Sequence, residues 1–206
     1  MTSLRHALLV LCSFAIGCAP TAAPVKPQAE KTAKVPSIWM PDASLTNQLT
    51  NVSTVGNYQI SLPSDFVQQP SGLILGSVQT STWKGPAGAE TPSLVLRITI
   101  QADDRGIDVA RKDMRRFLEV FTASVADGSN IKIVRREKTE TGTLDGLQFT
   151  RFRWAGSAEK DVPVSGFAYG AIDGTSSIII TALNFGSDTD RANKLTESVI
   201  ATFKKK

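Results

Sequence analysis

Apolar and polar residues alternate along several stretches of the chain, and this alternation predicts β-strands. Tyr58, Ile60 and Leu62 alternate with polar residues and are followed by Pro63, which cannot donate a hydrogen bond to a neighbouring strand. Further strands are predicted over residues 73–83, 94–100, 131–138, 146–154, 162–172 and 176–184, with a hairpin loop over 85–92. The short glycine-containing links between the last four strands predict an antiparallel meander.

Two of these strands carry large apolar residues on both faces. In the strand over 146–154, Phe149 and Arg151 point to one side while Phe152 and Trp154 point to the other. Three consecutive isoleucines, at 178–180, make a later strand apolar on both faces as well. The sheet is therefore expected to be covered on both sides.

After residue 108 the hydrophobic period lengthens to between three and four residues, which predicts one amphipathic helix. The residues at this spacing are Val109, Ala110, Met114, Phe117, Leu118, Phe121 and Val125. Asp127 and Gly128 end the helix. Its other faces are basic (Arg111, Lys112, Arg115 and Arg116), and we expect a solvated surface on which Arg115 pairs with Glu119 one turn later.

A second helix is predicted at the C-terminus. Ser187 is a candidate N-cap, with Asp190 three residues later, and Leu195 and Phe203 lie on the inner face of the helix. The three final lysines favour a helix C-terminus. The fold class is thus α+β: a twisted antiparallel sheet of about six to seven strands flanked by two helices, an α/β/α sandwich in the order β-β-β-α-β-β-β-β-α.

The first residues have the features of a secretory signal peptide. A short start carrying Arg5 precedes an apolar run over residues 7–16, and small residues follow. The run is too short to cross a bilayer, which takes about 20 apolar residues in a helix. Residues 1–17 are therefore predicted to be removed on export.

The end of this run, Ala15-Ile16-Gly17-Cys18, resembles the bacterial lipoprotein signal. The resemblance implies cleavage between Gly17 and Cys18 and a lipid on Cys18, which would hold the protein to a membrane of the bacterial cell envelope, on its periplasmic or outer side. Two or three acyl chains anchor a protein stably, whereas one binds reversibly. The alternative is an ordinary signal-peptidase cut that leaves Cys18 unmodified.

Residues 18–51 are rich in proline, alanine and lysine and have no sustained period, which predicts a flexible linker ahead of a domain over 52–206. Ile38, Trp39 and Met40 interrupt the linker. We expect this apolar triplet to dock on the domain or to touch the bilayer interface.

The charge distribution argues against nucleic-acid binding. The whole chain has a formal charge of +4, but residues 51–203 hold 16 Lys and Arg against 17 Asp and Glu. Nucleic-acid binding needs a concentrated basic face, which a near-neutral domain with basic tails does not supply.

The residue types that remain after cleavage exclude several chemistries. The single histidine, His6, and Cys12 belong to the leader, and Cys18 would carry the lipid. The mature chain would then lack Ser-His-Asp and Cys-His catalysis, His/Cys metal sites and disulfides. No catalytic residue, cofactor or metal is predicted.

The densest acidic cluster is Asp103, Asp104 and Asp108. It lacks the alternating spacing of a calcium-binding loop and lies just before the first predicted helix, where acidic residues stabilise a helix N-terminus. We therefore interpret it as a capping cluster.

The apolar pattern of the domain also carries a family resemblance. The residues are Tyr58-x-Ile60-x-Leu62-Pro63-x-x-Phe66, Gly146 with Phe149 and Phe152, the hairpin over 170–184 and the helix over 188–203. In this order they resemble the PsbP-like extrinsic proteins of photosystem II and small bacterial lipoproteins. The resemblance implies an α/β sandwich that binds or assembles without catalysis.

Three functions follow as expectations. The first is a non-catalytic, membrane-anchored accessory or binding module of the cell envelope, held through Cys18, with an envelope protein as its candidate partner. The second is a carboxylate-based envelope hydrolase, which needs two acids flanking a cleft. Its candidate acids, Asp145, Glu159, Asp161 and Asp173, all lie at predicted turns. The third is a carrier of a small apolar ligand, which needs a pocket between sheet and helix.

Overall fold

The computed structural model of the protein describes residues 37–70, 77–85, 87–88, 91–92, 94–102, 104–186 and 189–206. These residues belong to one structural unit, which runs from Val35 to Lys206. The predicted signal peptide 1–17 with Gly17 and Cys18, the linker up to residue 36, Asp103, Ser187 and the first residues of the strand predicted over 73–83 lie outside the described residues.

The main sheet has nine strands among the described residues. Its order is β1-β10-β11-β12-β13-β8-β5-β4, and β9 also pairs with β11. The bounds are β1 Ser37–Ile38, β4 Val67–Gln68, β5 Val78–Lys84, β8 Leu94–Gln101, β9 Lys132–Arg136, β10 Glu140–Leu144, β11 Leu147–Ser157, β12 Pro163–Asp173 and β13 Ser176–Phe185. All pairings are antiparallel except that of β1 with β10, so the sheet is mixed and mostly antiparallel.

Two smaller sheets accompany it. β2 (Asn51–Val55), β3 (Tyr58–Leu62) and β14 (Lys204–Lys205) form a three-stranded sheet in the order β14-β3-β2. β6 (Ala87–Gly88) and β7 (Thr91–Pro92) form a two-stranded ribbon within the predicted hairpin loop. The 3₁₀ turns η1 (Thr46–Gln48) and η2 (Glu159–Asp161) complete the set.

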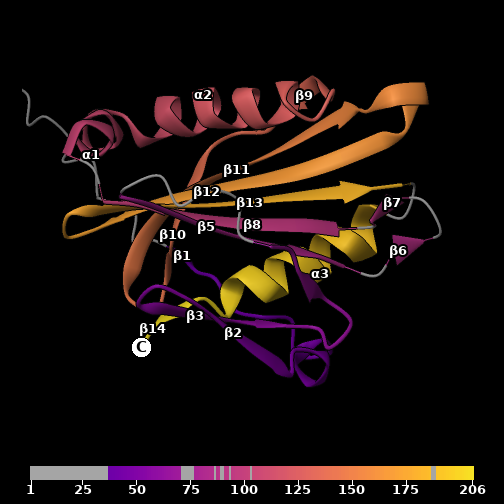
Figure 1. Cartoon of the computed structure of the whole chain (residues 1–206), viewed down its shortest axis with the longest axis horizontal. Coiled ribbons are helices and arrows are strands. Elements are labelled where there is room, and N and C mark those ends of the chain that lie inside the picture. Colours follow the sequence, from indigo (N-terminus) through magenta and orange to yellow (C-terminus); the bar gives the residue numbers. More distant parts are fainter. Residues whose placement is uncertain are drawn as a thin grey trace, which may run out of the picture. The chain divides into compact units, whose positions relative to one another are not determined.

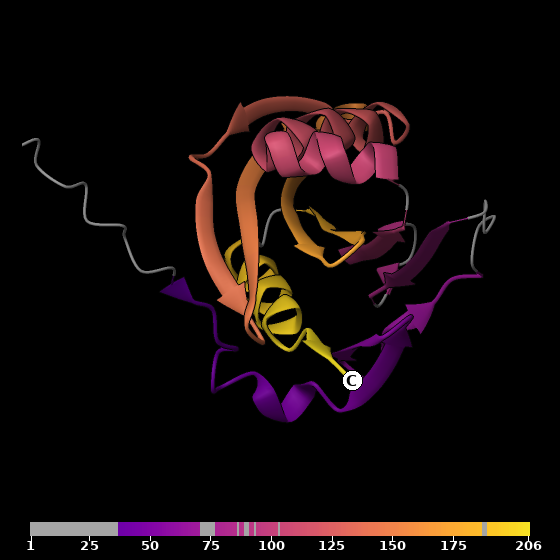
Figure 2. The same ribbon diagram turned by 90° about the vertical axis from the view of Figure 1, so that its left-hand side faces the viewer.

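Helices cover both faces of the main sheet (Figure 1). α1 (Asp104–Lys112) and α2 (Met114–Asp127) lie on one face, while α3 (Thr189–Ala201) and the three-stranded sheet lie on the other. From the side, β10 and β11 curl down beside α3 (Figure 2). The predicted α+β class with helices on both faces is therefore confirmed.

A separate hydrophobic core lies on each face of the main sheet. The strand over 146–154 predicts this, because it carries large apolar residues on both faces. Phe149 belongs to the core between the sheet, α3 and the small sheet, whereas Phe152 and Trp154 belong to the core under α2. α2 packs closely on the sheet at Gly170, where an added Cβ would lie 2.5 Å from Met114 Sδ.

The strand count is larger than the six to seven predicted, because several strands are too short or too polar to show a period. β1, β4 and β14 have two residues each, and β10 contains a single large apolar residue, Leu144. The strand predicted over 58–62 exists, but it lies in the separate three-stranded sheet.

The single helix predicted after residue 108 is two helices. Asp113 separates them, because its backbone is extended (φ −157°, ψ 85°) and its carboxylate accepts a hydrogen bond from the Arg116 N–H as the N-cap of α2. Asp104 is the first residue of α1, so it lies at the N-terminus of this shorter helix, whereas Asp108 lies inside it. The apolar period continues across the break, which hides it from the sequence pattern.

The chain ends differently from the prediction. α3 stops at Ala201, and Lys204 and Lys205 pair with Gln59 and Tyr58 of β3 instead of ending a helix. Phe203, expected on the helix face, is buried beyond the helix end and stacks on Tyr58.

Candidate functional site

A partly buried ionic network lies between α3 and the curled strands β10 and β11. The Arg151 guanidinium, 13% exposed, lies 2.8 Å from Glu140 Oε2 and 2.9 Å from Glu197 Oε1, and it donates to the Tyr169 hydroxyl at 3.1 Å. Arg153 donates to the same Glu197 oxygen at 2.6 Å. Glu197 on α3 therefore ties two arginines of β11 to the helix.

Trp39 covers this network. The centroid of its ring lies 4.3 Å from the Arg151 guanidinium carbon. The ring also makes an edge-to-face contact with Tyr169, with the two ring centroids 5.4 Å apart. The ring rests on Gly142 of β10, where an added Cβ would collide with it. Trp39 is thus a docked residue, while Ile38 and Met40 beside it are 73% and 75% exposed.

Residues on both sides of Trp39 also contact the domain. β1 pairs with β10, the Trp39 N–H donates to the Thr143 carbonyl, and the Asp42 N–H donates to Ser198 Oγ of α3. The sequence places residues 18–51 in a linker, whereas the described part of that range, residues 37–51, lies against or within the domain.

The arginine and the tyrosine of this network both hold their protons strongly. Burial raises the pKa of Tyr169 to about 12, although Arg151 opposes the shift. Burial alone would lower the pKa of Arg151, but Tyr169, Glu140 and Glu197 outweigh it, so that its pKa lies above the ordinary value. Both residues therefore keep their protons near neutral pH.

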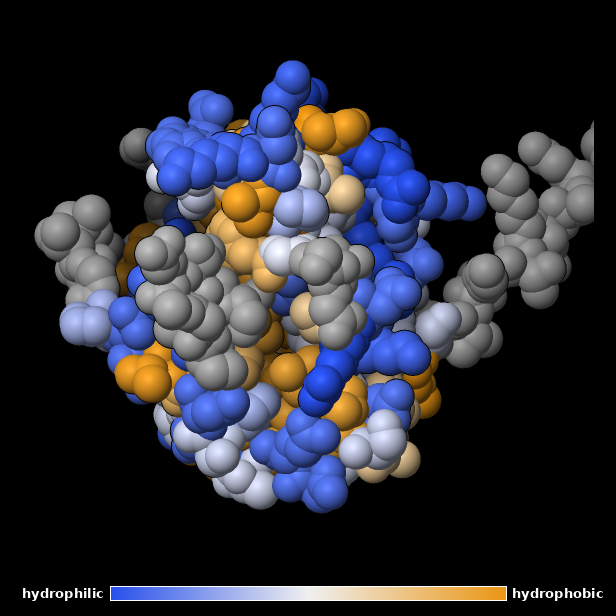
Figure 3. Space-filling view, turned by 90° about the vertical axis from the view of Figure 1, so that its right-hand side faces the viewer, coloured by the Kyte–Doolittle hydropathy of each residue, from blue (hydrophilic) through white to orange (hydrophobic). Residues whose placement is uncertain are grey.

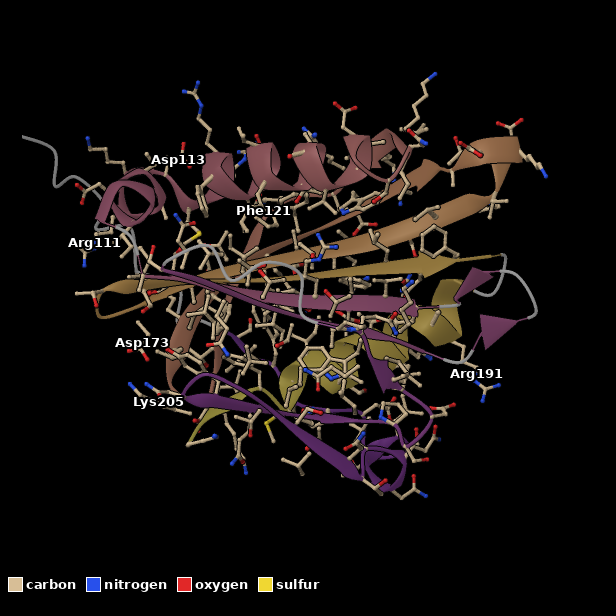
Figure 4. The ribbon with its side chains drawn as sticks, in the orientation of Figure 1. Arg111, Asp113, Phe121, Asp173, Arg191 and Lys205 are labelled. Atoms are coloured by element: carbon tan, nitrogen blue, oxygen red, sulfur yellow. The ribbon has the colours of Figure 1, made fainter. Side chains whose placement is uncertain are left out.

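Three of the four acids that the sequence places at turns have hydrogen-bond partners, and the fourth, Asp161, lies in η2. Asp173 accepts hydrogen bonds from the Tyr58 hydroxyl at 2.7 Å and from Lys205 Nζ at 2.8 Å, and its pKa is lowered first by Lys205 and then by Tyr58. Asp145 accepts from the Lys205 N–H, and Glu159 accepts from Asn130 Nδ2. Figure 4 shows Asp173 and Lys205 together near the C-terminus.

No group of three or more His, Cys, Asp or Glu residues gathers among the described residues. None of their helices combines the length and the apolar character needed to cross a bilayer.

A larger hollow opens at the other end of α3. Its volume is about 730 Å³, compared with about 280 Å³ for the hollow beside Trp39. It lies between η1, the loop after β3, the first residue of β8, the end of β13 and the first turns of α3. Its lining residues are Asn47, Gln48, Thr50, Pro63, Ser64, Asp65, Phe66, Leu94, Phe185, Arg191, Ala192 and Leu195. We call it the α3 hollow.

The α3 hollow has an apolar floor and a polar rim. Phe66 (5% exposed) and Leu94 (3% exposed) belong to the core under α3, and Leu195 packs against that core. Viewed from this end, hydrophobic atoms gather in the middle with hydrophilic atoms around them (Figure 3). At the rim, Arg191 points outward from the start of α3 (Figure 4).

A polar chain fixes the helix that forms one wall. Asn193 Oδ1 of α3 accepts hydrogen bonds from Ser165 Oγ and from Asn184 Nδ2, each at 2.8 Å. Thr196 Oγ1 donates to Asn184 Oδ1 at 3.0 Å. Asn184 and Thr196 are buried, so their hydrogen bonds hold α3 in one position on β12 and β13.

On the outer face of α2, the predicted pair of Arg115 and Glu119 is confirmed, with Arg115 Nε and Glu119 Oε1 2.9 Å apart. Both side chains reach solvent, so the pair adds little stability.

No protein-family model matches the sequence, and no curated protein sequence matches it. Among solved structures, the chain is similar to cyanobacterial PsbP (CyanoP) from Synechocystis, at 13% identity and a TM-score of 0.45 over 73% of this chain and 87% of that one. It is also similar to the Ran-binding protein Mog1p of Saccharomyces cerevisiae, at 8% identity and a TM-score of 0.45 over 72% and 89%. A PsbP protein is thus among the solved structures to which this chain is similar.

A protein from Bacteroides thetaiotaomicron is similar at 14% identity and a TM-score of 0.43. The match covers 73% of this chain and 45% of the length of that protein.

Proposed function

We propose that the protein is a non-catalytic binding module of the bacterial cell envelope, held to a membrane by a lipid on Cys18 after cleavage behind Gly17. The domain binds through the α3 hollow, and the anchor keeps that hollow close to the membrane surface.

The observation that carries the proposal is the composition of the hollow. Asp65 is the one carboxylate among its described lining residues. Hydrolysis by carboxylates needs two acids on opposite sides of the bond, one of them with a raised pKa. A cavity with one acid and an apolar floor is suited to holding a molecule, and this favours binding over the alternative of an envelope hydrolase.

The acids elsewhere support the same choice. Glu140 and Glu197 both bind Arg151, and Asp173 binds Lys205 and Tyr58. The pKa of Asp173 is lowered, which is the opposite of what a general acid requires at neutral pH.

The length of chain after Cys18 limits how far an anchored domain can lie from the membrane. Ser37, the first described residue, follows Cys18 by 19 positions. A chain of that length spans at most about 65 Å when fully extended. The lipid would therefore keep the domain within that distance of the bilayer.

Fractionation of bacteria that express the full chain tests the anchor. We expect the protein in the membrane fraction after a carbonate wash, and we expect Cys18→Ala to release it. Cys12→Ala is the matched control, because Cys12 lies in the predicted leader. Release of the Cys12→Ala and unsubstituted chains alike by the wash would count against a lipid anchor.

The third expectation, a carrier of a small apolar ligand, is a second candidate function. The position of the α3 hollow between the main sheet and α3 favours it, since this is where a carrier would hold its cargo.

A further inference from the structure

From the geometry of the α3 hollow we infer its ligand: a small amphiphile with a compact apolar body and an uncharged or zwitterionic head. This inference rests on the proposed function, because it assumes that the hollow is the binding site. It adds the class of molecule that the hollow takes.

The size of the hollow limits the ligand. A volume of about 730 Å³ lies within the range of about 300–1,000 Å³ typical of small-molecule sites. The hollow can therefore enclose one body of drug-like size.

The floor selects an apolar body. Phe66, Leu94 and Leu195 lie at the edge of the core under α3, so a ligand that fills the hollow extends that core. Covering such apolar surface is favourable by roughly 25 cal/mol per Å² removed from water.

The rim selects the head of the ligand. Asn47 and Gln48 offer amides that both donate and accept hydrogen bonds, and Ser64 offers a hydroxyl. Asp65 and Arg191 carry opposite charges, so the described rim has no net charge. The rim would give a head with a net charge little electrostatic attraction. A neutral hydrogen-bonding head or a zwitterionic head, in contrast, finds a partner at the rim for each of its groups.

The walls are preformed. The Phe66 N–H donates to the Pro63 carbonyl, which closes the turn after β3. The Phe66 ring lies against Gly85, where an added Cβ would be 3.1 Å from it. On the opposite side, Asn193 fixes the first turns of α3 to the sheet. A preformed cavity loses little conformational entropy on binding.

A matched pair of fluorescent probes tests the ligand class. Phenylnaphthylamine is uncharged, and anilinonaphthalene sulfonate has a similar aromatic body with an anionic group. We would titrate both probes into the full chain carrying Cys18→Ala. This chain has no cysteine at the proposed lipidation site, so it should need no detergent. We expect phenylnaphthylamine to bind at one site and at least tenfold more tightly than the sulfonate.

Two variants place the site. Ala192→Trp fills the hollow from α3, and Gln48→Trp fills it from an exposed position on η1, where it cannot disturb the core. Each is expected to weaken phenylnaphthylamine binding at least tenfold. Ala123→Trp on the exposed face of α2 is the matched control and should stay within twofold. Unchanged far-ultraviolet circular dichroism verifies that each variant is folded.

The outcomes separate the two proposals. Absence of binding to the unsubstituted hollow, or equal binding by both tryptophan variants and the control, would overturn the site. Equal or tighter binding of the sulfonate would overturn the uncharged head. Both results are independent of Cys18, so a failure here leaves the test of the anchor unaffected, and the reverse also holds.

Discussion

Replacing Trp39 with alanine tests whether the segment before residue 51 is part of the folded domain. In the structure its indole contacts Arg151, Tyr169 and Gly142. If the segment were only a tether, removing the ring would leave the stability of the domain unchanged. The structure instead predicts a clear loss.

The size of the loss follows from the contacts. Truncating a fully buried Trp costs about 3–5 kcal/mol, and a half-buried ring about half of that. The cation–π contact with Arg151 and the edge-to-face contact with Tyr169 each contribute about 1 kcal/mol of their own in other proteins. Because these terms overlap, we expect Trp39→Ala to lower the free energy of unfolding by about 2–3 kcal/mol. For a domain of this size the melting temperature would fall by about 5–10 °C.

The assay is urea unfolding of the Cys18→Ala chain, followed by far-ultraviolet circular dichroism so that loss of the indole does not alter the signal. Ile38→Ala and Met40→Ala are the controls, since both side chains are exposed and should change the free energy by less than about 0.5 kcal/mol. A Cβ at Gly142 would collide with the same ring and with the Ser37 carbonyl. Because only the collision with the ring is removed by Trp39→Ala, the effect of Gly142→Ala should be smaller in the Trp39→Ala background than alone.

If Trp39→Ala costs no more than Ile38→Ala or Met40→Ala, the indole does not stabilise the domain. If the losses from Trp39→Ala and Gly142→Ala are additive, the two changes act on different contacts, and the ring does not rest on Gly142.

Three further predictions concern titration and packing. Burial raises the pKa of Tyr169 to about 12 and, together with Asp173, that of Tyr58 further. Since these are the two tyrosines of the chain, the folded protein should show almost no tyrosinate absorbance at pH 10.5 (about half a unit above the ordinary pKa), whereas the urea-unfolded chain should titrate near 10. Both tyrosines have a higher pKa in the folded state than in the unfolded state, so the free energy of unfolding should fall as the pH rises above about 10. Asp113→Ala should cost about 1 kcal/mol by removing the N-cap of α2, while Asp108→Ala within α1 should cost less in the same urea assay. Gly170→Ala should cost about 1–3 kcal/mol, because its Cβ would lie 2.5 Å from the nearest atom of α2.

Each of these has a contrary result. A tyrosine that titrates near 10 in the folded protein would mean that its hydroxyl reaches water. Equal losses for Asp113→Ala and Asp108→Ala would mean that the helix break is not capped by Asp113. An unchanged stability for Gly170→Ala would mean that α2 packs less closely than described.

The long elements of the fold could be predicted from the sequence because their burial pattern is strong. The alternation around Phe149 and Phe152 indicates a strand buried on both faces, and the two cores confirm it. The short elements could not be predicted. β1 and β14 are defined by pairing with longer strands, β10 and β3, and not by a pattern of their own. Lys204 and Lys205, for example, pair with β3 although the residues before them form a helix.

The helix break and the candidate site escape prediction for different reasons. Asp113 interrupts a helix without interrupting the apolar period, so that only its own backbone and cap reveal the break. The α3 hollow draws its residues from five separate parts of the chain, between Asn47 and Leu195. Residues this far apart in the chain form no motif that a sequence pattern could reveal.

The most direct test of the proposed function is the intact mass of the mature, membrane-associated protein. We predict the mass of residues 18–206 plus a diacylglyceryl group, and the loss of that species in Cys18→Ala. A product cut at another position, unmodified and free in the periplasm, would contradict the anchor. The domain would then be a soluble exported module.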